Sequence, residues 1–415
     1  MIKNWEITRV VSSRYYLKLF AATFIVTVGM VGLTNVVIDP FGVYRLILID
    51  GFNKYKEPGL RRFEAQIEYQ MKSKKPQAII LGSSRTINIS ADHRGWRARP
   101  VANLSMSGAV IREIVSLLKY TNSKRPLEQV VVGLDFFAFN ANEKSRGDRG
   151  VKEAILRTSG EEYSVKGRGW VSQINVPGLT NYPFAIGTLE HSLKTIWNQD
   201  KYERFYDDAN GRYDRFVLEL ANGQNTKFNK PYTINYSSGG STFDHFRELV
   251  DFCYQNEIDL RLYISPIHAL WYEKYVRSGK LDKIENWKRK IVKILDDTSK
   301  RHQKKIPLSV LDFSGYSQIT TEDLPVWGGQ IEAMRWYSDL NHFSDTQGDR
   351  ILDRLFLPPR RNDGLHGSYG VRLSPQNIEQ HLRRIRNERE AYLARRGSHI
   401  EQLFSKATRR ASSLH

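Results

Sequence analysis

One uncharged segment near the N-terminus limits what this chain can fold into. From Leu19 to Ile38 the sequence is LFAATFIVTVGMVGLTNVVI, which contains no charged residue. A helix of about 20 apolar residues spans the hydrocarbon core of a bilayer. Because every face of such a helix is apolar, a core helix of a soluble domain is the less favoured alternative. The segment therefore predicts a transmembrane anchor over residues 19–38.

Residues that flank the anchor predict its orientation. Tyr15 and Tyr16 precede it, where an interfacial aromatic belt would lie. The same side carries one acidic residue, Glu6, and several basic ones: Lys3, Arg9, Arg14 and Lys18. The positive-inside rule then places residues 1–18 in the cytoplasm and the rest of the chain outside it. A cleaved signal peptide is the alternative, but no A-x-A cleavage pattern stands before Asp39.

Short apolar segments after the anchor alternate with segments of helical pattern. The predicted strands are residues 77–81, 101–104, 129–134, 259–264 and 308–313. The predicted helices are residues 110–120, 241–255, 280–303 and 345–356, and the segment from Ser241 to Asp244 is predicted to be a capping box that opens the second of them. This alternation predicts an α/β fold, a three-layer sandwich around an open five-stranded parallel sheet. Ligands bind such sheets at the carboxyl ends of the strands, so functional residues are expected at those ends.

The same pattern divides the chain into segments. Residues 39–76 are predicted to be a juxtamembrane helical linker, and residues 77–357 the α/β domain. Residues 141–240 interrupt that domain and are polar and aromatic, which indicates an inserted subdomain or lid. Residues 358–415 are a basic tail with a cationic helix, predicted at residues 375–396. We expect that helix to be solvated, and contact with a membrane surface or an acidic polymer is the alternative.

Charge and composition narrow the partners. The formal net charge is +18, from 63 Lys and Arg against 45 Asp and Glu, which favours acidic partners. Neither a zinc-finger spacing nor a Walker-type loop supports nucleic acid as the partner. Anionic lipid and an acidic polymer remain as candidate partners. We find no metal-ligand spacing and predict neither a metal nor a cofactor. The single cysteine, Cys253, is predicted to be a buried thiol.

A pair of hydroxyls follows the first predicted strand, in the segment Gly82-Ser83-Ser84-Arg85. A strand that turns tightly into a helix places a hydroxyl at the helix N-terminus, where free N–H groups favour an anion or a developing oxyanion. Taken alone, this turn fits a capping serine or a phosphate site as well as a nucleophile.

Two further segments complete a possible acyl-ester site. In Asp339-Leu340-Asn341-His342 the carboxylate can fix the imidazole tautomer while the histidine acts as general base and then acid. A structural Asp–His pair is the alternative for this segment by itself. Gly108 follows the second predicted strand, and a glycine N–H can approach a ligand closely. An ordinary helix-entry turn is the alternative there.

Taken together, these segments resemble the SGNH (GDSL-like) hydrolase family, over most of residues 77–357 outside the insertion. The resemblance implies that Ser84 is the nucleophile and that His342 and Asp339 complete a Ser-His-Asp triad. It also implies that the backbone N–H groups of Ser84 and Gly108 bind the oxyanion.

This sequence departs from the family at its third block. The segment Gly133-Leu134-Asp135 replaces G-x-N-D, so the Asn that donates a third hydrogen bond is missing. Asp135 would repel an oxyanion, and we predict a structural or substrate-orienting role for it. Arg85 or a residue of the insertion is the predicted replacement for the Asn.

With its anchor, the chain resembles a membrane-anchored subset of that family, which includes relatives of the alginate O-acetylation proteins and of the D-alanyl transfer protein of teichoic acids. The resemblance implies a bacterial cytoplasmic-membrane protein with its catalytic domain in the periplasm or outside the cell. It also implies transfer of an acyl group, with acetyl as the expected one, from a multi-pass membrane-bound O-acyltransferase to a polysaccharide. The basic charge suits an acidic polymer as that polysaccharide. A carbohydrate esterase and a non-catalytic glycan-binding or assembly subunit are the alternatives.

Two residues close to the predicted site have two interpretations each. His268 follows the strand at residues 259–264 and is either a substrate contact or a loop or core histidine. Trp336 lies shortly before Asp339 and either walls the pocket, where it could stack on a sugar, or packs in the core.

Overall fold

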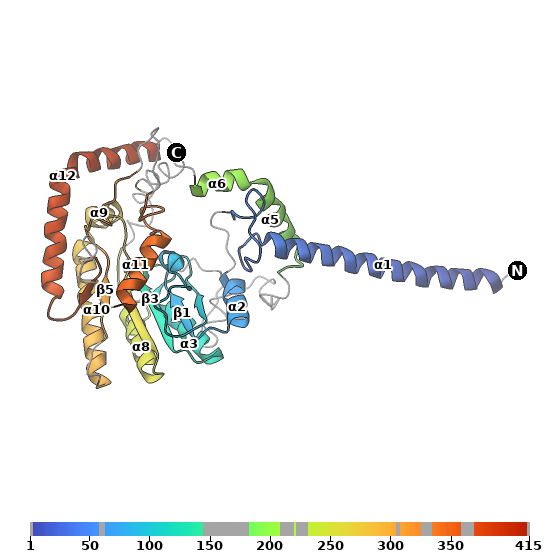
Figure 1. Ribbon diagram of the computed structural model, residues 1–415, viewed down its shortest axis with the longest axis horizontal. Coiled ribbons are helices and arrows are strands. Elements are labelled where there is room, and N and C mark those ends of the chain that lie inside the picture. Colours follow the sequence, from blue (N-terminus) through green and yellow to red (C-terminus); the bar gives the residue numbers. More distant parts are fainter. Residues whose placement is uncertain are drawn as a thin grey trace. The chain divides into compact units, whose positions relative to one another are not determined.

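The computed structural model describes residues 3–57, 63–143, 182–207, 220, 231–303, 308–324, 334–357 and 369–412. They fall into two compact units. The first comprises Met1–Tyr69 and Val165–Tyr206, and the second comprises Gln70–Ser164 and Asp207–His415, each as far as it is described. Figure 1 labels their helices and strands.

The second unit is built on one mixed sheet of six strands in the order β2-β1-β3-β4-β5-β6. The strands are β1 (Ala78–Leu81), β2 (Val101–Asn103), β3 (Gln129–Leu134), β4 (Asp259–Ile264), β5 (Val310–Asp312) and β6 (Val371–Leu373). The first five pair in parallel, and β6 pairs antiparallel with β5. The five predicted strands are therefore confirmed, and the prediction of a purely parallel five-stranded sheet is corrected by β6. That strand is short and partly exposed, so it lacks the apolar run that marks the others.

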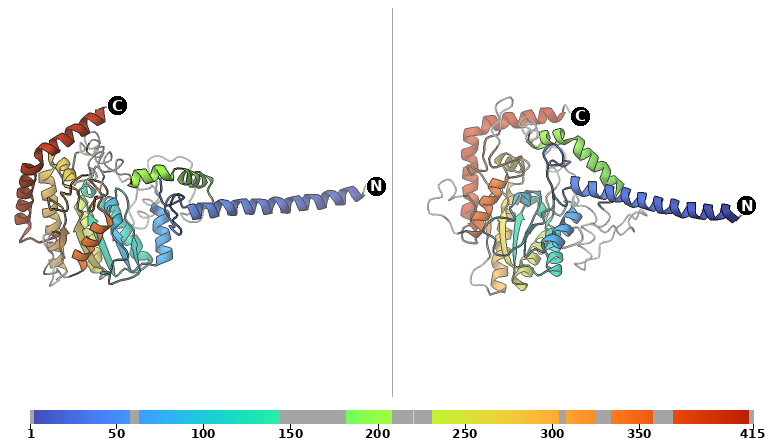
Figure 2. Two further views of the ribbon diagram at one scale, coloured as in Figure 1. Left: turned by 45° about the horizontal axis from the view of Figure 1, so that its top comes forward. Right: turned by 45° about the vertical axis from the view of Figure 1, so that its right-hand side comes forward.

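Helices cover both faces of this sheet, which makes three layers (Figure 2). On one face, α8 (Thr242–Gln255) lies between α3 (Ile111–Lys124) and α10 (Leu281–Arg301). On the other face, α11 (Asp345–Phe356) packs beside the short helix η1 (Ser84–Asn88). The core beneath α11 consists of alternate strand residues and apolar residues of the helix: Ile80, Val131, Tyr263, Leu311, Ile351, Leu352 and Leu355.

A local capping signal fixes the start of α8, as the sequence predicts. The backbone N–H of Ser241 donates to Asp244 Oδ2 at 2.7 Å, and Ser241 Oγ accepts from the N–H of Phe243 at 3.2 Å. This reciprocal arrangement satisfies N–H groups that the first turn of a helix leaves free.

The C-terminal helix is part of the second unit, which corrects the prediction of a solvated tail beginning at residue 358. Helix α12 (Ile378–Ser412) packs against α10. Two of its arginines, Arg386 and Arg389, bind the buried carboxylates of Glu285 and Glu273 at 2.6–2.9 Å. Its buried apolar residues recur at helical spacing: Ile378, Leu382, Ile385, Tyr392, Ile400, Leu403, Phe404 and Ala407. That stripe, hidden among many charges, is the physical reason that α12 docks.

The first unit contains α1 (Lys3–Ile38), whose segment Ser13–Ile38 includes an 18-residue stretch with a mean hydropathy of 2.0. This segment is long and apolar enough to cross a membrane, as a helical anchor or a signal sequence would be. Helix α5 (Ile186–Trp197) packs on α1 and is followed by α6 (Gln199–Asp207). Both come from the predicted insertion, whose residues 144–181, 208–219 and 221–230 lie outside the described part. Helix α2 (Phe63–Lys74) lies in the predicted linker.

Candidate active site

The first part of the site is the turn that leaves β1. Ser83 caps η1, since its Oγ accepts from the backbone N–H of Arg85 at 3.2 Å, and Ser84 is the first residue of η1. Gly82 has φ +150, and a Cβ there would lie 2.6 Å from Oγ1 of Thr86. Only glycine fits this position without displacing its neighbours.

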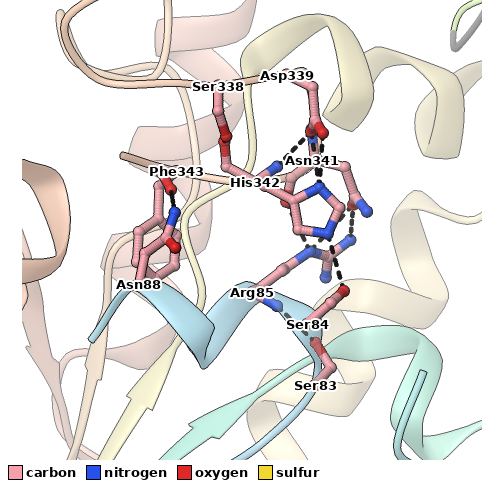
Figure 3. Close-up of polar contacts among 9 residues, drawn as sticks. All are labelled: Ser83, Ser84, Arg85, Asn88, Ser338, Asp339, Asn341, His342 and Phe343. Atoms are coloured by element: carbon pink, nitrogen blue, oxygen red, sulfur yellow. Dashed lines mark hydrogen bonds and ion pairs between the residues drawn. The ribbon is translucent and has the colours of Figure 1, made fainter. Parts of the chain in front are cut away.

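Ser84, His342 and Asp339 form a hydrogen-bonded chain (Figure 3). Ser84 Oγ lies 2.8 Å from Nε2 of His342. Nδ1 of the same ring lies 2.7 Å from Asp339 Oδ2 and 2.9 Å from Oδ1. An ionised carboxylate at this position selects the tautomer with a proton on Nδ1, which leaves Nε2 free to accept the proton of Ser84.

The surroundings of Asp339 favour its ionised form. Its carboxylate is 7% exposed, and its Oδ1 accepts from the backbone N–H groups of Asn341 at 2.8 Å and of His342 at 2.7 Å. Burial by itself raises the pKa of this carboxyl, but the charge of His342 and these hydrogen bonds outweigh burial and lower the pKa below its ordinary value. Ser84 and His342 are only partly buried, so the acid is enclosed while the hydroxyl can be reached.

The loop that carries His342 is fixed between η1 and α11. Tyr337 and Phe343 form an isolated antiparallel bridge, which closes the loop on itself. Asn88 at the end of η1 donates to the carbonyl of Phe343 at 2.5 Å, and Ser344 caps α11. The imidazole is therefore held by backbone contacts on both sides.

A buried ion pair joins the three loops of the site. Arg85 Nη1 lies 2.5 Å from Asp135 Oδ1, and Ser83 Oγ donates to Asp135 Oδ2 at 2.5 Å. Arg85 Nε also donates to the carbonyl and to the side-chain oxygen of Asn341, at 3.1 and 3.0 Å. Arg85 thus links the turn after β1, the end of β3 and the loop of His342.

This network settles the geometry of two residues that the sequence singled out. Asp135 faces Arg85 and Ser83, contacts that favour the structural one of its two predicted roles. Arg85 is 4% exposed; burial lowers the pKa of its guanidinium, but Asp135 outweighs burial and raises it. Its guanidinium donates to Asp135 and Asn341, which makes it a positioning residue; its role as a replacement oxyanion donor stays a prediction.

A residue that sequence reasoning missed supports the nucleophile turn from the neighbouring strand. Asn103, at the end of β2, donates through Nδ2 to three carbonyls of the η1 segment at 2.9–3.1 Å, those of Thr86, Ile87 and Ile89. Its Oδ1 accepts from the N–H of Ser105 at 3.1 Å. The sequence carries one hint, because Asn103 follows a strand and precedes the loop of Gly108.

Gly108 lies in the connection from β2 to α3, at the same edge of the sheet as Ser84. It has φ +68, which favours glycine, and the nearby Met106 N–H donates to the carbonyl of Gly82 at 3.0 Å. The two loops are therefore joined directly. The role of the Gly108 N–H as an oxyanion donor stays a prediction.

His268 and Trp336 are placed by packing. His268 is 1% exposed and begins α9 (Ala269–Arg277): Nδ1 accepts from the N–H of Leu270 at 3.2 Å, and Nε2 lies 2.7 Å from the carbonyl of Glu322. Both nitrogens are engaged, which matches the core-histidine alternative and corrects the substrate-contact one. The Trp336 ring is partly buried and lies 4.6 and 4.8 Å from the guanidinium carbons of Arg335 and Arg350, so sugar stacking on it stays a prediction.

Within the described ranges, no group of three or more His, Cys, Asp or Glu side chains could hold a metal ion. Comparison with models of known protein families and with curated proteins finds no match to this chain. The arrangement of Ser84, His342 and Asp339 at the carboxyl edge of the sheet is therefore the feature that points to a function.

Proposed function

We propose that this protein transfers an acyl group through a covalent acyl-Ser84 intermediate. The observation that carries the proposal is the chain of hydrogen bonds from Ser84 through His342 to Asp339, with distances of 2.8 and 2.7 Å. A hydroxyl, an imidazole and an enclosed carboxylate in this order are the parts of an activated serine nucleophile. They lie beside the point where the strand order reverses between β1 and β3, where open α/β sheets bind ligands.

The proposed reaction has two half-steps. Ser84 Oγ attacks the acyl carbonyl of the donor as His342 Nε2 takes the hydroxyl proton, and the leaving group departs with that proton. A hydroxyl of the acceptor then attacks the acyl-serine while His342 takes its proton, and Ser84 recovers a proton as the new ester leaves. Asp339 stabilises the imidazolium in both steps and keeps its own charge.

The oxyanion would be bound by backbone N–H groups at the start of η1 and in the loop of Gly108. The Asn of a G-x-N-D block is absent, and Arg85 is committed to Asp135 and Asn341. Loss of one such donor typically lowers the rate by about 10²–10³. We therefore propose a slow enzyme, or one whose site is completed by its partner.

The acceptor and the partner follow from the resemblance and from α1. As a membrane anchor with the N-terminus in the cytoplasm, α1 would place the site outside the cytoplasm. A multi-pass membrane-bound O-acyltransferase would supply the acyl group, most simply acetyl, and a cell-surface or secreted polysaccharide would receive it. The net charge of +18 supports an acidic polymer as acceptor.

The test is labelling of the purified full-length protein with a fluorophosphonate probe, followed by mass spectrometry of the adduct. We expect an adduct on Ser84 that is lost in His342→Ala, while Ser105→Ala, in a neighbouring loop, is labelled as the unaltered protein is. No adduct on Ser84 in a protein with an unaltered melting temperature would contradict the proposal. Released acetate without acetylated glycan would indicate the esterase instead.

A further inference from the structure

Exposed apolar side chains surround the C-terminal end of α1 within the first unit. They come from two segments and are 39–80% exposed; we call them the apolar collar: Leu46, Ile47, Leu48, Ile49, Phe184, Ile186, Leu193 and Trp197. Such a cluster in water would be unfavourable, and large exposed apolar patches mark interaction surfaces.

Helix α5 has one inward face and one exposed face. Its buried small polar residues, Thr188, Ser192 and Thr195, face inward. The exposed face presents the collar residues of the helix, Ile186, Leu193 and Trp197, and Glu190 lies in the same stripe, four residues after Ile186. Glu190 forms an exposed ion pair at 2.6 Å with Lys194, which lies at the side of the stripe. Large exposed apolar side chains beside a lysine, whose long stem can carry its charge to water, are typical of a helix in a membrane interface.

The contacts of this segment fix its depth along α1. Asn35 Nδ2 donates to the carbonyls of Pro183 at 2.6 Å and Ala185 at 3.3 Å, and its Oδ1 accepts from Ser192 Oγ at 2.8 Å. A Cβ on Gly32 would lie 2.5 Å from the ring of Phe184. The start of α5 therefore docks on α1 at the level of Gly32 and Asn35.

That level coincides with the expected edge of a bilayer. The uncharged part of the segment begins at Leu19, after Arg14 and Lys18, and about 20 residues at about 1.5 Å each cross the hydrocarbon core. Counted from Leu19, the core ends at Ile38. The docking site of α5 therefore lies roughly 5–9 Å inside that end, a depth to which interfacial side chains insert.

The second segment of the collar is tied to the same end of α1. Asn53 donates to the carbonyls of Val37 at 2.8 Å and Ile47 at 3.0 Å, and its Oδ1 accepts from the N–H of Ile49 at 2.8 Å. Lys56 Nζ donates to the carbonyl of Ile38 at 2.7 Å. The buried Asn53 and the partly buried Lys56 thus satisfy backbone groups that lipid could not satisfy.

We propose that the apolar collar is inserted in the acyl–headgroup boundary of the leaflet at the C-terminal end of α1. The occupant of this surface is lipid, because the collar is continuous with the apolar surface of α1 and lies at the depth where that surface must leave the bilayer. The anchor is then a spanning helix plus an interfacial collar. This inference depends on α1 spanning the membrane and does not depend on acyl transfer.

The test uses the full-length protein in lipid nanodiscs without any other protein. Single cysteines at Leu193→Cys and Trp197→Cys carry an NBD fluorophore, and Lys194→Cys, about 100° around the helix from Leu193, is the control at the side of the stripe. Native Cys253 is 1% exposed, so it need not be replaced before labelling of the folded protein. Val26→Cys in α1 shows that the helix is in the bilayer.

We expect NBD at positions 193 and 197 to emit at shorter wavelength and to be quenched several-fold more by lipids brominated near the headgroup than NBD at position 194. Iodide in the buffer should quench position 194 preferentially. Equal iodide quenching at all three positions, with Val26→Cys protected, would overturn the proposal in favour of a protein partner. Protection from iodide without quenching by brominated lipid would overturn it in favour of a second copy of the chain.

Discussion

Ser84 Oγ and His342 Nε2 lie 2.8 Å apart although 258 positions separate the two residues in the chain. One comes from the turn after β1 and the other from the loop before α11. Their meeting depends on α11 and η1 packing side by side on one face of the sheet. The predictions below test what this contact does and what holds it in place.

Removing either end of this contact should abolish acyl transfer. Ser84→Ala eliminates the atom that would carry the acyl group, and His342→Ala eliminates its general base. We expect each substitution to lower the rate by about 10⁴-fold or more, and the double variant to be no worse than either single one. Rates of acyl-polymer formation, with melting temperatures as the folding control, decide this. Cells that carry either variant and behave as cells with the unaltered protein do would identify a non-catalytic subunit.

Asp339→Asn should separate orientation of the imidazole from its presence. An amide NH₂ facing Nδ1 favours the tautomer with a proton on Nε2, which cannot accept the proton of Ser84. We expect a loss of about 10⁴-fold in the rate of acylation, with little change in the affinity for an acyl donor. Single-turnover labelling of Ser84 measures the rate. Unchanged labelling would show that Asp339 has only a structural role.

The buried ion pair of Arg85 and Asp135 should contribute more to the free energy of unfolding than an exposed ion pair does. Asp135→Asn leaves the Arg85 charge buried with one opposing charge fewer, and breaking a buried pair typically costs about 3–5 kcal/mol in the free energy of unfolding. Arg247→Met, which breaks the exposed pair with Asp244 at 2.8 Å, should cost below about 1 kcal/mol. Urea unfolding of both variants compares the two losses. Equal losses would contradict a buried, structural pair.

Burial of His268 should make stability depend on pH. Burial lowers the pKa of this imidazole to about 4, whereas the unfolded chain has an ordinary value of about 6.5. Below that ordinary value the imidazole is protonated in the unfolded chain but stays neutral in the folded protein. The contribution is therefore complete above about pH 6.5 and is lost as the pH falls towards 4, by on the order of 3 kcal/mol.

The difference between the unaltered protein and His268→Asn isolates this effect. The amide can still accept from the N–H of Leu270 but does not titrate. We expect the melting temperature of the unaltered protein to fall more steeply between pH 6.5 and 4 than that of the variant. Parallel curves would show that His268 is not the group responsible.

Truncation should distinguish a docked C-terminal helix from a solvated tail. A chain that ends after residue 374 lacks α12 and exposes the carboxylates of Glu273 and Glu285, which α12 arginines bind in the intact protein. We expect it to aggregate or to melt at least several degrees lower, whereas a chain that ends after Ala407 should melt as the full chain does. Circular dichroism melts measure both, and equal melting temperatures would contradict docking.

The sequence by itself determined the features that have a local signature. An uncharged run predicted the apolar part of α1, short apolar runs predicted β1 to β5, and Ser241 with Asp244 predicted the start of α8. The same holds for the residues of the site, because Ser84 and His342 lie in short motifs that can be found without the fold. Periodicity, capping and turn chemistry act over a few residues, so a linear pattern records them.

Only the tertiary structure decided which of these residues meet. The pairing of Arg85 with Asp135, the three hydrogen bonds of Asn103 and the burial of His268 join segments that lie far apart in the chain. β6 and the docking of α12 were missed because a three-residue strand and an apolar stripe among many charges give weak local patterns, and packing against β5 and α10 stabilises them instead. Long-range contacts leave no periodic trace in the sequence, and here they convert two short motifs into one candidate site.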